Sequence, residues 1–110
     1  DLVFFTATNG NTDSTIFALN KADGSVAWST VFTAPTESSP VAVYNEDGDG
    51  WIVQALSDGQ LVMLDATDGT VLDTLQLDGE VRASPAVYRD VLVISTTGSD
   101  PSYIYAITLE

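Results

Sequence analysis

The sequence predicts an all-β protein built from a repeated unit, and three observations support this. Short segments recur at a fixed spacing of 45 residues: an Asp-Gly pair at 23–24 returns at 68–69, and a Ser-Pro pair at 39–40 returns at 84–85. Apolar and β-branched residues form short runs between polar, glycine-containing segments, as in strands and turns. No stretch shows the apolar period of a helix. A fixed period of this length is typical of one supersecondary unit stacked on the next.

The first third of the chain predicts three strands. Residues 2–8 are rich in β-branched and aromatic side chains, which strands favour. The polar cluster at 9–14 predicts a turn, and residues 15–20 follow it as the second strand. The Asp-Gly turn at 23–24 precedes the third strand, residues 25–32.

The middle of the chain predicts four strands. The first of them, residues 39–44, is opened by a proline, which cannot donate a ladder hydrogen bond and suits a strand start or an edge. A loop of acids and glycines, 45–50, leads to strands 51–56 and 61–65, which a Ser-Asp-Gly-Gln hairpin signal joins. Strand 71–77 follows the second Asp-Gly turn.

The last three expected strands span residues 84–88, 91–96 and 103–108, and the first again opens on a Ser-Pro pair. Residues 61–64 are apolar without a break, so both faces of that strand are expected to be covered. Stacked sheets covered on both faces are typical of propeller blades. The sequence therefore predicts an all-β segment of a β-propeller.

The repeats resemble the pyrroloquinoline-quinone-like (PQQ-like) β-propeller repeat, which occurs in quinoprotein dehydrogenases and in many propellers that bind no quinone. The family's hallmark is alanine, a gap, aspartate, two gaps, threonine-glycine, three gaps and tryptophan. In the first copy, these motif positions are occupied by Ala18, Asn20, Asp23, Gly24 and Trp28. In the second copy, they are occupied by Met63, Asp65, Asp68, Gly69 and Asp73. The third copy contributes Ala106 and Thr108. Asn20 and Asp23 depart from the pattern, and Asp73 replaces the tryptophan.

On the family's four-strand blade, with strand A innermost and strand D outermost, the chain runs B-C-D, A-B-C-D, A-B-C. The resemblance thus implies about two and a half blades. They comprise an incomplete blade at 1–34, a complete blade at 38–79 and an incomplete blade at 83–110.

In the family, the tryptophan packs on the glycine-bearing turn of the adjacent blade. The resemblance therefore implies that Gly24, Trp28 and Gly69 dock blades together. Asp73 implies a weaker or differently built junction at its own position.

A closed propeller needs about four to eight blades. We therefore expect this chain to be a segment of a longer propeller, with assembly of several copies into a homo-oligomeric ring as the alternative. The first five residues lack the basic flank of a signal peptide, so we expect no such peptide here.

The formal net charge is −13, and the basic residues are Lys21, Arg82 and Arg89. Nucleic acids and anionic membrane surfaces require phosphate-neutralising side chains, so neither is expected as a partner. The charge fits solubility, a high-salt habitat or a basic partner. There is no apolar run long enough for a membrane-spanning helix, so no membrane insertion is expected. The absence of cysteine fits a protein outside the cytoplasm.

One loop has the composition of a metal site. Asn45, Asp47 and Asp49 place side-chain oxygens at alternate positions, and glycines at 48 and 50 allow the tight turn that a Ca²⁺ loop needs. The loop resembles the calcium loop of integrin-type propeller repeats, where these would be the first, third and fifth ligands. The further acid of that pattern is absent, because residues 51–54 are Trp-Ile-Val-Gln. Two interpretations stay open: a solvated turn and a weak Ca²⁺ site.

Catalytic groups are scarce. The chain has neither histidine nor cysteine, so its serines lack an activating base and no thiol can act as nucleophile. We expect no catalysis and no PQQ in this segment, with Ca²⁺ as the one cofactor left open. Tyr44 and Tyr88 end the strands that the Ser-Pro pairs open, and are the best candidates for surface recognition.

The expected function is a non-catalytic binding or scaffolding module outside the cytoplasm. Its loops and channel rim would face a protein or glycan partner, or further propeller blades. The alternative is a piece of a quinoprotein dehydrogenase whose active site lies in blades outside this segment.

Overall fold

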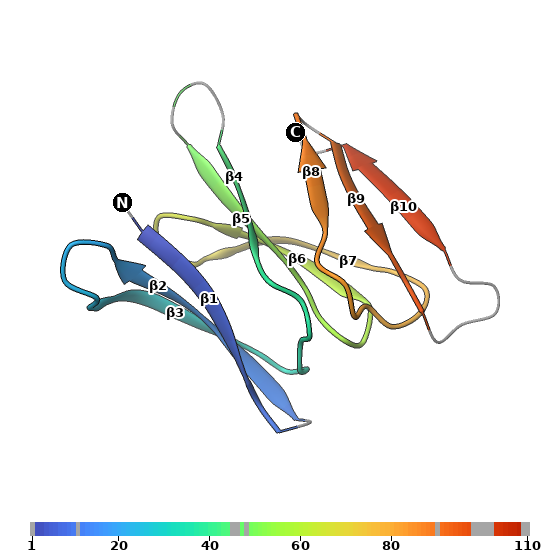
Figure 1. Cartoon of the computed structure of the whole chain (residues 1–110), viewed down its shortest axis with the longest axis horizontal. Coiled ribbons are helices and arrows are strands. Elements are labelled where there is room, and N and C mark those ends of the chain that lie inside the picture. Colours follow the sequence, from blue (N-terminus) through green and yellow to red (C-terminus); the bar gives the residue numbers. More distant parts are fainter. Residues whose placement is uncertain are drawn as a thin grey trace.

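The computed structural model describes residues 2–10, 12–44, 47, 49–89, 91–97 and 103–108. In these ranges the chain forms ten β-strands in three sheets that lie side by side as layers (Figure 1). No helix in the same ranges is long and apolar enough to cross a membrane. The predicted all-β class is confirmed.

Each sheet consists of strands that are consecutive in the sequence and antiparallel. The first has the order β1-β2-β3 and contains Leu2–Asn9 (β1), Asp13–Asn20 (β2) and Val26–Phe32 (β3). The second contains Val41–Tyr44 (β4), Gly50–Ala55 (β5), Gln60–Asp65 (β6) and Val71–Gln76 (β7), in that order. The third has the order β10-β9-β8 and contains Ala86–Tyr88 (β8), Val91–Ser95 (β9) and Ile104–Thr108 (β10). This up-and-down order is that of propeller blades.

The middle sheet is covered on both faces. Alternate residues of β6 point to opposite sides, so that Val62 and Leu64 pack toward the first sheet, while Leu61 and Met63 pack toward the third. The core between the first two sheets contains Ile16, Ala18, Trp28, Phe32, Ala34, Ile52, Leu56, Val62, Leu64 and Ala66. The core between the second and third contains Val53, Ala55, Leu61, Leu77, Val81, Leu92 and Ile94. The expectation from the unbroken apolar run is confirmed.

Strand β4 begins later than the sequence predicts, and the residues before it bond instead to the segment that precedes β8. Ser38 Oγ donates to the carbonyl oxygen of Ala83 at 2.9 Å. The backbone N–H of Ser39 donates to Ser84 Oγ at 2.8 Å, and Pro40 has no N–H to offer a ladder. Equivalent positions of successive repeats are thereby joined, which brings β4 close to β8.

The two Asp-Gly turns have the same geometry. The N–H of Gly24 donates to the carbonyl of Asn20 at 2.8 Å, and the N–H of Gly69 donates to the carbonyl of Asp65 at 2.9 Å. The φ angles are 76° at Gly24 and 79° at Gly69, in the left-handed region that glycine enters most easily. The repeat therefore extends to individual backbone hydrogen bonds.

Candidate functional site

At the first junction, between the first and second sheets, an indole ring closes the outer end. Trp28 of β3 lies against the turn after β6, and its Nε1 donates to the carbonyl oxygen of Ala66 at 2.9 Å. A Cβ on Gly69 would lie only 2.4 Å from Trp28 Cε3, so the ring rests directly on the glycine. Thr30 Oγ1 donates to the carbonyl of Gly69 at 2.8 Å. The ring and these two hydrogen bonds attach the first sheet to this turn.

A buried glutamine ties together the inner half of the same junction. Gln54 of β5 is fully buried, and its Oε1 accepts a hydrogen bond from Thr6 Oγ1 of β1 at 2.7 Å. Its Nε2 donates to Thr36 Oγ1 at 3.0 Å and to the carbonyl of Ser38 at 3.2 Å. A buried polar group left without a partner costs about 1–3 kcal/mol, so these bonds favour one arrangement of the two sheets and the linker.

Sequence reasoning missed Gln54. The available signal was a lone amide inside the otherwise apolar segment 51–56. A polar side chain on a strand that is covered on both faces needs buried hydrogen-bond partners, which predicts a hydrogen-bond network at that point.

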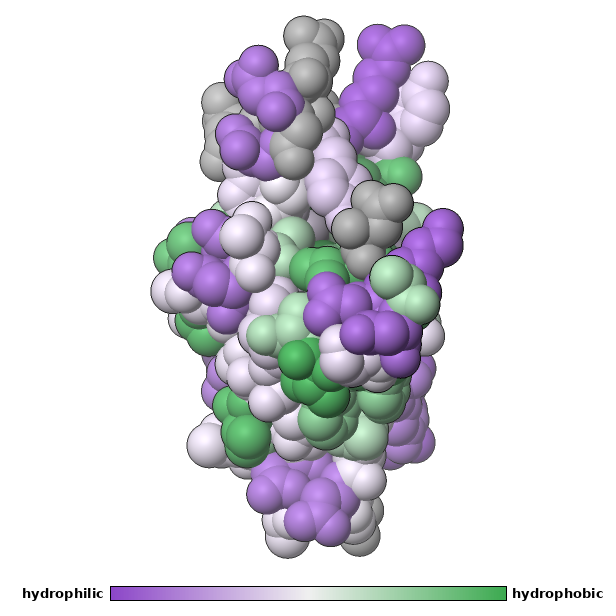
Figure 2. Space-filling model, turned by 90° about the vertical axis from the view of Figure 1, so that its left-hand side faces the viewer, coloured by the Kyte–Doolittle hydropathy of each residue, from purple (hydrophilic) through white to green (hydrophobic). Residues whose placement is uncertain are grey.

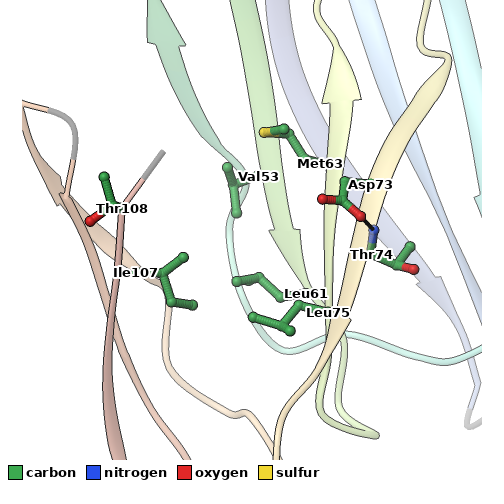
Figure 3. Close-up of a pocket in the computed structure, with 8 residues that line it drawn as sticks. All are labelled: Val53, Leu61, Met63, Asp73, Thr74, Leu75, Ile107 and Thr108. Carbon is green, nitrogen blue, oxygen red and sulfur yellow. Dashed lines mark hydrogen bonds between the residues drawn. The ribbon is translucent and has the colours of Figure 1, made fainter. Parts of the chain in front are cut away.

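At the second junction, between the second and third sheets, the equivalent pair of residues differs. Ala18 and Trp28 are cross-strand neighbours on β2 and β3, whereas Met63 and Asp73 are neighbours on β6 and β7. Asp73 is exposed, and its carboxylate accepts a hydrogen bond from the N–H of Thr74 at 2.8 Å. A cavity of about 360 Å³ lies here (Figure 3), lined by Val53, Leu61, Met63, Asp73, Thr74, Leu75, Ile107 and Thr108.

Polar contacts hold another part of the second junction. The N–H of Asp78 donates to the hydroxyl of Tyr105 at 3.1 Å. Glu80 and Thr97 form an antiparallel bridge, with N–H···O distances of 2.8 and 2.7 Å. Polar contacts therefore hold the second junction together, and Asp73 stands on β7 at the position that Trp28 has on β3.

The structure places the three predicted docking residues unequally. Trp28 and Gly69 are in contact across the first junction. A Cβ on Gly24 would meet nothing within 4 Å, so in the described part of the chain this turn packs against no neighbouring sheet. The energetic role of each residue stays a prediction, which substitutions can test.

The predicted calcium loop lies partly outside the described residues, because Asn45 is not among them. Asp47 and Asp49 are exposed in the loop between β4 and β5. Within the described ranges, no three acidic, histidine or cysteine side chains gather closely enough to hold a metal ion. Calcium binding by this loop stays a prediction. The described residues offer no acidic cluster that fits a quinone with its metal ion, and the expectation that PQQ is not bound here also remains open.

Two aspartates organise the repeated turns. Asp23 Oδ1 accepts hydrogen bonds from the N–H of Ser25 at 3.0 Å and from its hydroxyl at 2.7 Å. Asp68 Oδ1 accepts one from the N–H of Thr70 at 2.9 Å. These hydrogen bonds lower the pKa of both carboxyl groups below the ordinary 3.8. The bond from the backbone N–H has the larger effect, and the side-chain bond adds to it. Both groups are therefore charged at neutral pH and fit a turn-forming role better than acid–base chemistry.

Apolar sheet faces are exposed at both ends of the stack. On the first sheet the exposed residues are Val3, Phe5, Val26 and Val31, and the rings of Phe5 and Phe17 stack at 5.1 Å. Figure 2 shows apolar and weakly polar residues in the middle of this end of the molecule, with polar residues on both sides of them as well as above and below. On the third sheet the exposed residues are Tyr88, Val91, Val93 and Ile104. Faces of this kind are typical of surfaces that another blade or a partner covers.

The repeats and the stacked sheets have a counterpart among known families. Residues 12–108 match a PQQ-type family model described as outer membrane protein assembly factor BamB. The chain belongs to this family. The all-β propeller segment with PQQ-like repeats predicted from the sequence is thereby confirmed.

Two curated relatives illustrate the range of proteins that contain such repeats. BamB of Yersinia pestis is 31% identical over 106 residues, which cover 92% of this chain and 25% of the relative. The beta-alanine-activating enzyme of Mus musculus is 32% identical over 102 residues, which cover 91% of this chain and 9% of the enzyme. The chain thus spans a quarter or less of each of these proteins.

A solved structure agrees with the fold. BamB of Moraxella catarrhalis superimposes with a TM-score of 0.65 and 14% identity, over 99% of this chain and 36% of that chain. The likeness supports the arrangement of the three sheets as part of a longer propeller fold.

Proposed function

We propose that this segment is a non-catalytic binding and scaffolding module of a BamB-like propeller, with proteins as its partners. The observation that carries the proposal is the family match over residues 12–108. One relative, by its name, is a factor in the assembly of outer membrane proteins. The exposed apolar faces at both ends of the stack support a role in which other blades or partners pack against it.

The proposed location is outside the cytoplasm. The name of the Yersinia pestis relative, which refers to the outer membrane, supports it, as does the absence of cysteine from the chain. The names of the enzyme relatives give no location.

Site-specific cross-linking tests the proposal. A photoreactive amino acid replaces Tyr44, which is 59% exposed at the end of β4, in the protein that contains this segment in its own cell. We expect discrete adducts with other proteins after illumination. The same group at Thr12, in the exposed turn between β1 and β2, is the matched control. Adducts of equal yield at both positions, or at neither, would contradict specific recognition at this rim.

A second candidate is that the segment belongs to an enzyme and serves its chain as a propeller part. The 32% identity to the beta-alanine-activating enzyme favours it. The complete protein, assayed with β-alanine and ATP, distinguishes the two candidates, since activation of β-alanine would assign the segment to an enzyme. Dye reduction in the presence of PQQ and Ca²⁺ tests the quinoprotein alternative in the same way, and we expect neither activity.

A further inference from the structure

Three polar side chains meet in the inner half of the first junction: Thr6 of β1, Thr36 of the linker between β3 and β4, and Gln54 of β5. Gln54 accepts a hydrogen bond from Thr6 and donates one to Thr36, so its amide joins the two hydroxyl groups. Both Gln54 and Thr36 are buried. Among the described residues, every buried side-chain nitrogen or oxygen has a hydrogen-bond partner. We call these three residues the polar trio.

The strand pairing identifies the equivalents of two of them at the second junction. Thr6 and Ala55 each pair with the residue two positions before the first motif residue of a repeat. Gln54 and Ile94 each pair with the residue one position before it. Ala55 therefore has the place of Thr6, and Ile94 has the place of Gln54.

The third equivalent is Val81, which follows Thr36 at the repeat distance of 45 residues. Together with Ala55 and Ile94 it forms an apolar trio, whose members are at most 2% exposed and belong to the core between the second and third sheets. The same three backbone places are thus all polar at one junction and all apolar at the next.

A junction that mixed the two sets would leave polar groups without partners. If the first sheet stacked directly on the third, Thr6 would face Ile94 and its hydroxyl would lose the amide. If the second sheets of two copies stacked like successive repeats, Gln54 would face Ala55 and its buried Oε1 would lose its donor. A buried polar group without a partner is more costly than a hydrogen bond is favourable, so both wrong arrangements are disfavoured.

We propose that the polar trio selects the neighbour of the middle sheet. The face that carries Gln54 accepts a blade with a hydroxyl at the place of Thr6, and it excludes an apolar blade face, including the one on a second copy of this chain. Specificity of this kind comes from penalising the wrong partner as well as from favouring the right one. A single buried polar residue determines the register and the partners of coiled-coil helices in the same way.

The first test compares matched and mixed junctions in the full chain by urea unfolding. Gln54→Ile removes the amide and keeps the hydroxyls, whereas Thr6→Ala with Thr36→Val removes the hydroxyls and keeps the amide. We expect either change to lower the folding equilibrium constant about tenfold or more. The three changes together give the first junction the residues of the second, and this triple variant should be more stable than either mixed variant.

Thr30→Val is the matched control, because it removes a hydroxyl from the outer end of the same junction. Its effect should simply add to that of Gln54→Ile. If the triple variant is instead the least stable of the set, the trio contributes hydrogen bonds and no selection, and the inference is wrong.

The second test reports which sheets are neighbours. The N–H of Ser39 lies 2.8 Å from the hydroxyl of Ser84, its equivalent one repeat later. If the second sheets of two copies stacked, the Ser39 residues of both chains would lie side by side. The chain has no cysteine, so a single Ser39→Cys can form a disulfide only between two copies.

Under mild oxidation, we expect Ser39→Cys to give up to about tenfold more disulfide-linked dimer in the triple variant than in the parent chain. Thr12→Cys, in the exposed turn between β1 and β2, should give the same yield in both and controls for random encounters. Equal dimer yields from Ser39→Cys in the two chains would overturn the inference, since other residues would then set the order of the sheets. Neither test involves a binding partner, so each outcome is independent of the proposed function.

Discussion

The two junctions are built from equivalent strands, yet they are closed by different chemistry. At the first, an indole ring lies on a glycine turn and donates to a backbone carbonyl. At the second, a methionine and an aspartate occupy the equivalent pair of positions, and a cavity lies beside them. The comparison teaches that a repeated backbone does not by itself fix which side chains close a junction, because the same cross-strand position carries Trp28 in one repeat and Asp73 in the next.

The two glycine turns also share a backbone geometry but differ in their contacts. Gly24 and Gly69 have nearly identical φ angles, but only Gly69 lies under a ring. Within the described residues, Gly69 therefore combines the shared backbone requirement with a packing contact.

Removal of the indole ring should have the largest effect. We expect Trp28→Ala to lower the free energy of unfolding by about 3–5 kcal/mol, because it deletes a large buried side chain and leaves a cavity. Trp28→Phe keeps a ring but loses the bond to the Ala66 carbonyl, and should cost about 1–2 kcal/mol. Urea unfolding followed by circular dichroism measures both. A loss below about 1 kcal/mol for Trp28→Ala would mean that the indole does not hold the junction.

The matched glycine substitutions separate packing from backbone strain. Gly24→Ala should cost about 1 kcal/mol, since only the left-handed φ is unfavourable for alanine. Gly69→Ala should cost about 2–3 kcal/mol, because its methyl group also collides with Trp28. Urea unfolding of the two variants gives the difference directly. In a Trp28→Ala background the difference should shrink to what the Thr30 hydroxyl, 2.8 Å from the same Cβ, contributes. An undiminished difference would contradict the role of the ring.

The buried amide should matter next. Gln54→Leu should cost about 1–3 kcal/mol, because the buried Ser38 carbonyl and the half-buried Thr6 hydroxyl lose a partner. Thr6→Val in the same chain removes one of the groups left unpaired and should recover part of the loss. A double-mutant cycle with thermal unfolding measures the coupling. Strict additivity would show that the two side chains act independently.

At the second junction, a substitution should stabilise the fold instead. Asp73→Leu replaces a carboxylate beside an apolar cavity, and we expect a gain of up to about 1 kcal/mol. Asp58→Leu, in the exposed hairpin turn between β5 and β6, is the control and should give no gain. Thermal unfolding compares them. A loss of stability in Asp73→Leu would mean that the carboxylate, through its bond to the Thr74 N–H, supports β7.

The turn aspartates should give the smallest effect, and one that depends on pH. Their folded-state pKa values lie below the ordinary value, so the stability they contribute is present above pH 3.8 and is lost as the pH falls through the folded pKa values. The double variant Asp23→Asn and Asp68→Asn should melt at a lower temperature than the parent at pH 7. The two melting temperatures should converge below pH 3.8. A difference that is constant with pH would rule out the charge as its cause.

Much of the fold could be predicted because its signals are local. The Asp-Gly and Ser-Pro pairs marked the period, and the apolar run at 61–64 indicated that both faces of one strand are covered. Pairings between sheets are not local. The contact of Trp28 with Gly69 was expected from a family pattern and not from the spacing of residues alone.

The cavity and the buried glutamine could not be placed in advance for the same reason. The exchange of Ala18 and Trp28 for Met63 and Asp73 is visible in the sequence, but the cavity beside it is also lined by Ile107, which lies in another sheet. Gln54 was visible as a polar interruption, yet its partners on β1 and in the linker become neighbours only after the sheets stack.

The bonds from Ser38 to Ala83 and from Ser39 to Ser84 join one position of a repeat to the same position of the next. Such a contact runs head to tail, and nothing in it specifies how many units follow. A gene that gains or loses one whole repeat keeps this contact intact, whereas the gain or loss of a single strand would bring unlike positions of two repeats together. Copy number in this lineage should therefore change in steps of whole blades, with ring curvature and not the local bond setting the final count.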